Sequence, residues 1–238
     1  MIDKAALAHD GNHHEAQARH SPDRPGRAAG IVWGGTAIYA KVRNDRAPEA
    51  LSLSTPSAGA EPQEAPAAED LAGTWTVADG SQAGYRVDEV LNGQDVTVVG
   101  RTSDVEGSVT IDGTDLTAAD VTVAMTTITT DSGSRDGQFL DILKTDEHPT
   151  ATFTLTEPVD IAAVADGVAS VQATGDLTVA GVTQEVVVDL DAQTTAGGVE
   201  VSGSIPVTFS DYDISAPDLG FVKVEDAGTV EMLLTLTR

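Results

Sequence analysis

The residue types that most often carry catalysis have no arrangement in this chain that supports it. Only His148, of five histidines, lies in the strand-rich region, and no G-x-S-x-G motif is present to hold a nucleophilic serine. Carboxylates are dense, but pairs such as Asp131 and Asp136 have no specific partner base. The sequence therefore favours a protein that is not an enzyme.

Metal and cofactor sites are equally unsupported by the residue types present. The chain has no cysteine, which excludes disulfides, thiolate nucleophiles and cysteine-bound zinc. No calcium loop of the D-x-D-x-D-G type occurs, and the glycine-rich stretches stand in turn positions rather than between a strand and a long helix. We expect no metal ion and no cofactor.

The charge balance restricts the partners. Formal net charge is -25, from 13 basic and 38 acidic residues, so nucleic acid phosphates would be repelled. An acidic surface of this kind usually serves solubility or adaptation to salt. Hydrophobic residues make up 40% of the chain but aromatic residues only 4%, so the interior is built mainly from small aliphatic side chains.

An alternating pattern identifies the elements that form this interior. Residues 148 to 158 read HPTATFTLTEP, in which threonines alternate with Ala151, Phe153 and Leu155. Alternation with a period of two predicts a strand with one wet face and one dry face, and we expect these three side chains to point inward. Further strands are predicted over 84–91, 95–102, 106–113, 119–128, 171–181, 184–194, 199–209 and 229–237.

The strand lengths and turn signals favour an all-β antiparallel barrel or sandwich. One helical segment interrupts them, from Ser134 to Lys144, with Ser134 as the predicted cap and Phe139 and Leu143 on one side. We expect this helix to plug or flank one end of the β domain. A G-x-W sequence ending at Trp75 opens the first strand, where the indole is expected to join the core.

Three segments precede the β domain, which is predicted to span 71–238. Residues 1–27 are polar and predicted to be disordered. Residues 28–42 contain a charge-free stretch that fits a short membrane anchor or the apolar part of a secretory signal; a buried segment of a cytoplasmic protein is the alternative. Residues 43–70 are rich in Pro, Ala and Glu, as in an extended linker. If residues 28–42 are a membrane anchor or part of a secretory signal, the β domain lies outside the cytoplasm, either anchored to the membrane or secreted.

Six stretches occur in a distinctive order and spacing: 75–89, 98–113, 126–141, 148–158, 175–186 and 224–236. Together they resemble the YceI-like family and are most similar to its actinobacterial members. The resemblance implies a lipocalin-like barrel that holds a long isoprenoid chain in an apolar cavity, usually in exported proteins, with no catalytic centre. Near the end, many members have an Arg followed by Asp-Phe-Gly where this chain has FSDYDISAP over 209–217.

Small side chains would underfill a wide barrel, which leaves dry space for an apolar tail. The predicted cavity-lining residues are Tyr85, Val87, Val123, Phe139, Leu143, Ala151, Phe153, Leu155, Val179, Val207 and Phe209.

Cations are scarce in residues 71–238, so their positions are informative. Arg86, Arg101 and Arg135 are candidates for pairing with a phosphate, quinone or hydroxyl head group at the cavity mouth; ion pairs with neighbouring carboxylates are the alternative. Tyr212 and Tyr85 could instead donate a hydroxyl to a neutral head group. The sequence predicts a carrier of an isoprenoid or quinone-like lipid, with a packed interaction module of the cell envelope as the alternative, and it leaves a homodimer open.

Overall fold

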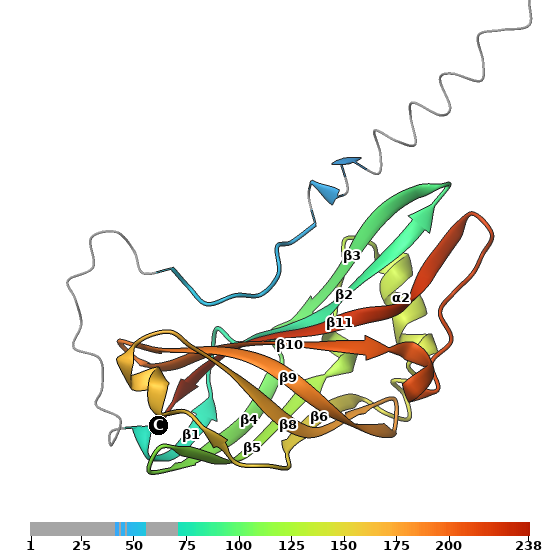
Figure 1. Ribbon diagram of the computed structural model, residues 1–238. Coiled ribbons are helices and arrows are strands. Elements are labelled where there is room, and N and C mark those ends of the chain that lie inside the picture. The colour runs from blue at the N-terminus through green and yellow to red at the C-terminus, as the bar shows by residue number, and fades with distance from the viewer. Residues whose placement is uncertain (1–40, 43, 46, 56–70) are drawn as a thin grey trace, which may run out of the picture.

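The computed structural model describes residues 41–42, 44–45, 47–55 and 71–238 (Figure 1). The predicted disordered N-terminus and most of the predicted apolar segment lie outside these residues. The strands are β1 (Gly73–Val77), β2 (Gln82–Leu91), β3 (Gln94–Thr102), β4 (Val105–Asp112), β5 (Asp115–Ala124), β6 (Thr150–Leu155), β7 (Val159–Asp160), β8 (Ala169–Val179), β9 (Val182–Thr195), β10 (Gly198–Thr208) and β11 (Val222–Thr237). The helices are η2 (Met125–Thr127), α2 (Gly133–Ile142), η3 (Ala162–Asp166) and η4 (Phe209–Tyr212).

Eight of the strands close into an antiparallel barrel. The order around the ring is β1-β4-β5-β6-β8-β9-β10-β11, and β1 closes it by pairing with both β4 and β11. Closure leaves these strands without free edges along most of their length. The predicted all-β antiparallel barrel with a short helix is therefore confirmed, and α2 is the one α-helix within residues 71–238.

The β2–β3 hairpin extends the wall of the barrel beyond the closed ring. Strand β11 is 16 residues long: its last residues pair with β1, and the stretch from Val222 to Leu233 pairs with β2. The two strands thus occupy successive parts of one edge of β11. In Figure 1 β2, β3 and β11 reach past the ring together, at the end of the barrel where α2 lies.

Trp75 belongs to the core at the other end of the barrel. Its side chain is 6% exposed, its indole Nε1–H donates to the Leu71 carbonyl at 2.8 Å, and the Arg238 guanidinium lies 4.6 Å from the ring centroid. The indole therefore satisfies its polar atom while filling apolar space, and a cation covers its face.

Helix α2 begins one residue before the predicted start. The predicted cap at Ser134 is wrong: Ser132 occupies the N-cap position, and its side chain makes no capping hydrogen bond. Instead, the Asp136 carboxylate accepts from the backbone N–H of Thr130 at 2.9 Å and from its hydroxyl at 2.7 Å. These bonds fix the first turn of α2 to the preceding loop.

Residues 47–55, which we call the strap, run along the outside of the barrel (Figure 1). At one end of the strap, Ser54 donates from its backbone N–H and its hydroxyl to Glu200 at 2.7 and 2.8 Å. Asn44 lies three residues before the other end of the strap. Its side-chain amide donates to the Asp95 carbonyl and accepts from the Thr97 backbone N–H, both at 2.9 Å. Asn44 thereby satisfies backbone groups on the free edge of β3. Asn44 and Ser54 both lie in the segment predicted to be an extended linker, so this part of the segment contacts the barrel.

No helix among the described residues is long and apolar enough to cross a membrane.

Candidate functional site

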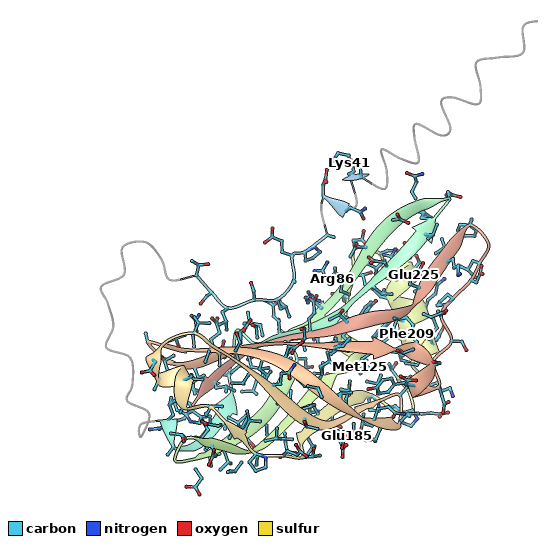
Figure 2. All side chains as sticks on the ribbon, viewed as in Figure 1. Lys41, Arg86, Met125, Glu185, Phe209 and Glu225 are labelled. Carbon is cyan, nitrogen blue, oxygen red and sulfur yellow. The ribbon has the colours of Figure 1, made fainter. Side chains whose placement is uncertain are left out.

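The largest feature inside the barrel is an apolar cavity of about 240 Å³ beside α2. Its wall comes from β2, β5, β6, β8, β10 and β11, from α2 and η4, and from the loop that precedes β11. Met125 and Phe209, labelled in Figure 2, belong to this wall. We call this space the outer cavity. Because its wall is mainly hydrophobic side chains, it suits an apolar guest far better than water.

The outer cavity brings together most of the predicted lining residues. Ten of the eleven belong to its wall, and Leu155 lines a second cavity instead. The predicted inward direction of the dry face of β6 is confirmed, since Ala151 and Phe153 are buried at 9% and 8% exposure. Contact between these residues and a ligand stays a prediction. Those in the outer wall are Tyr85, Val87, Val123, Phe139, Leu143, Ala151, Phe153, Val179, Val207 and Phe209.

Several wall residues were missed from the sequence. Val230 and Met232 alternate along β11 and could have been found by the same period of two that identified β6. Met125 and Ile128 lie in and just after the short turn η2, where no periodicity marks an inward direction.

The second cavity, of about 80 Å³, lies at the Trp75 end of the barrel and is lined by hydrophobic side chains. We call it the inner cavity. Val121, Phe153 and Met232 belong to the walls of both cavities, so the two spaces adjoin at these residues.

One ion-paired group stands in the wall of the outer cavity. The Arg135 guanidinium, on α2, lies 3.2 Å from the buried Glu89 carboxylate of β2 and 2.7 Å from that of Asp131. Two carboxylates and one guanidinium give this group a formal charge of -1. Arg135 lines the outer cavity, as Arg86 does, and carboxylates already hold its guanidinium. A third anion would have to compete with these two carboxylates for the guanidinium.

Tyr85 lies beside this group and stacks on Phe139, with ring centroids 4.9 Å apart and planes 9° from parallel. Burial raises the pKa of Tyr85 to about 12; nearby Arg135 opposes the rise, while Asp136 and Glu89 add to it. The phenol is therefore neutral at physiological pH and available as a hydrogen-bond donor.

Tyr212, on η4, is a residue of the outer-cavity wall that carries a buried hydroxyl. The residue is 4% exposed and belongs to the cavity wall. Among the buried side-chain oxygens and nitrogens of the described residues, its hydroxyl oxygen alone has no hydrogen-bond partner. Burial, followed by the charge of Asp211, raises the pKa of Tyr212, so the hydroxyl keeps its proton. A buried donor without a partner is costly unless a guest supplies the acceptor.

Arg86 is among the residues that line the outer cavity and Arg101 is not, and both are engaged in ion pairs. Both pair with the buried Glu231 carboxylate of β11: Arg86 Nε lies 2.9 Å from it, and Arg101 forms the second ion pair. Arg86 also donates to the carbonyl of Pro48 in the strap at 2.7 Å, so it lies between the strap and the sheet (Figure 2).

Strand alternation explains this placement. Although Arg86 and Glu231 belong to strands that wall the cavity, Tyr85 and Val87 point inward on β2, and Val230 and Met232 do so on β11. The residues between them face outward. For these two arginines the structure shows the ion pairs that the sequence gave as the alternative to head-group binding, and contact of either one with a head group stays a prediction.

Known proteins share the fold of this chain. A polyisoprenoid binding domain from Saccharophagus degradans, implicated in plant cell wall breakdown, is similar in structure, with 19% identity and a TM-score of 0.54 over 70% of this chain and 98% of that chain. BcnA of Burkholderia cenocepacia has 17% identity and a TM-score of 0.54 over 66% and 96%. These two likenesses show the fold alone. No curated protein matches the chain. The family model described as YceI-like domain matches residues 75–236, and the chain therefore belongs to the YceI-like family.

Proposed function

We propose that this protein binds a long-chain isoprenoid, or a similar apolar lipid, inside the barrel and acts as a carrier rather than as an enzyme. The observation that carries the proposal is the outer cavity, about 240 Å³ of space with hydrophobic walls inside a closed barrel. The polyisoprenoid-binding neighbour from Saccharophagus degradans supports the choice of ligand class.

An apolar tail can supply most of the affinity. Each methylene transferred from water into such a cavity contributes about 0.8 kcal/mol, so several prenyl units bind firmly without a specific polar contact. Polar groups in the wall then select the head group rather than hold the tail.

The polar groups at the cavity favour a neutral head group. Arg135 is shared between the carboxylates of Glu89 and Asp131, so a phosphate would have to compete with two carboxylates for this guanidinium. The Tyr212 hydroxyl, buried without a partner among the described residues, can donate to a hydroxyl or carbonyl oxygen. We therefore place a polyprenol or a long-chain quinone ahead of a polyprenyl phosphate.

The test is a titration of delipidated protein. The protein is stripped with organic solvent, refolded, and its melting temperature is measured with a polyprenol, a long-chain quinone and a polyprenyl phosphate in separate experiments. A ligand that binds only the folded barrel raises the melting temperature by mass action. We expect clear shifts with the two neutral lipids and a smaller one with the phosphate. No shift with any of them, for protein shown to be folded, would contradict the proposal and leave the packed envelope module.

We further propose that the barrel works outside the cytoplasmic membrane, secreted or held to the membrane by the N-terminal segment. The support is the charge-free sequence from 28 to 40 and the apolar ligand that the cavity suits. Cell fractionation tests this: intact protein in the soluble cytoplasm would contradict it. Two further points stay predictions: that the chain is most similar to actinobacterial members of the family, and that it forms a homodimer.

A further inference from the structure

A partition crosses the barrel where the outer and inner cavities meet. Val121, Phe153 and Met232 are the residues common to both walls. Val121 and Phe153 are direct neighbours in the pairing of β5 with β6, and Met232 comes from β11. The phenyl ring is the largest of these side chains. It therefore controls whether the two spaces act as one.

Two glycines make room for the long side chains of the partition. A Cβ at Gly175, on β8, would lie 2.4 Å from Cζ of Phe153, and a Cβ at Gly203, on β10, would lie 2.5 Å from Cε of Met232. Any other residue type would push the ring or the thioether away from its present position. Because both strands carry glycine at these points, the side chains of Phe153 and Met232 lie over the backbone of the neighbouring strand.

The inner cavity offers continued apolar space beyond the partition. It has about 80 Å³, and hydrophobic side chains form its wall as far as Trp75, whose indole N–H is already bonded to Leu71. A tail that entered it would displace no hydrogen bond of the indole and would strip no water from a polar wall. The obstacle to a longer tail is therefore steric and lies at the partition.

We propose that Phe153 sets the length of the apolar tail that the barrel accepts, by ending the outer cavity and closing the inner one. This inference rests on the proposed lipid binding and adds a specificity-determining residue to it. A tail that ends at the ring is bound in full. A longer tail leaves its excess outside the apolar space, where added methylenes contribute no further affinity.

The test is a binding series with isoprenoid alcohols of increasing length, applied to the full chain and to Phe153→Ala. In the unaltered protein, affinity should rise by about fourfold for each further buried methylene and then reach a plateau. In Phe153→Ala the plateau should move to a tail longer by at least one prenyl unit, because the tail now passes into the inner cavity. Leu155→Ala is the matched control: Leu155 lies two residues further along β6 and lines only the inner cavity, so its truncation enlarges that space without opening the partition and the plateau should not move.

Failure of this inference is distinct from failure of lipid binding. The same plateau in the unaltered protein and in Phe153→Ala overturns the length-setting role while lipid binding stands. No binding of any alcohol by the unaltered protein overturns the proposed function itself. If Phe153→Ala does not fold, Met232→Ala opens the same partition from β11 and should move the plateau in the same direction; an unchanged plateau there overturns the role equally.

Discussion

Replacing Tyr212 with phenylalanine should stabilise the lipid-free protein and weaken the binding of lipids that carry an oxygen. The hydroxyl is buried and lacks a partner among the described residues. Burial of an unsatisfied hydroxyl costs about 1–3 kcal/mol, so its removal should raise the free energy of unfolding by about 1–2 kcal/mol. Most substitutions at buried positions act in the opposite direction.

The assay is urea denaturation of delipidated protein, with Tyr85→Phe as the matched control. Tyr85 loses the same atom from the same cavity wall, but its hydroxyl is not among the buried atoms without a partner, so its stability at neutral pH should stay nearly unchanged. The binding of a polyprenol to Tyr212→Phe should weaken by about fivefold, which corresponds to one hydrogen bond of about 1 kcal/mol. A polyisoprene hydrocarbon without oxygen should bind both proteins equally.

The reasoning is refuted if Tyr212→Phe is less stable than the unaltered protein and binds the polyprenol equally well. That result would mean that the hydroxyl has a partner in the lipid-free barrel and does not meet the ligand.

Two further predictions concern the charged and titratable groups of the wall. Glu231→Gln should lower the free energy of unfolding by about 3 kcal/mol, because Arg86 and Arg101 lose their shared counter-charge. The control is Glu225→Gln, exposed on the same strand, which should change the free energy of unfolding by less than about 0.5 kcal/mol. Equal denaturation midpoints for the two variants would contradict the buried ion pairs. Burial raises the pKa of Tyr85 to about 12 in the folded protein, against 10.0 for the free side chain. The stabilisation that follows from this shift is complete below pH 10 and is lost as the pH rises through 12. Measured stability should therefore fall more steeply from pH 10 to 12 in the unaltered protein than in Tyr85→Phe, and parallel curves would show that the phenol is not buried as described.

Alternation made the barrel predictable from the sequence, and its consistent use would have placed more of the site. Ala151 and Phe153 were correctly placed inside because threonines separate them. The same rule on β2 puts Tyr85 and Val87 on one face, so Arg86 between them had to point outward. On that face Arg86 pairs with Glu231 and donates to the Pro48 carbonyl of the strap.

Other features depend on pairings that a single sequence does not display. The buried Glu231 is compensated by arginines on two other strands, and nothing near it in sequence marks that partnership. The contacts of Asn44 and Ser54 with the barrel join residues that are 51 or more positions apart. The partition likewise needs Gly175 of β8 beneath the ring of Phe153, a relation fixed by register between β6 and β8 rather than by local pattern.

Native mass spectrometry of the protein purified from its own cells, without detergent or organic solvent, tests the central claim most directly. The account predicts a folded protein that carries one additional mass, which is released on activation and extracts into organic solvent as an isoprenoid alcohol, a quinone or a similar neutral lipid. A folded protein that shows only the mass of its own chain, and that also gains no thermal stability from added polyprenol or quinone, would contradict it.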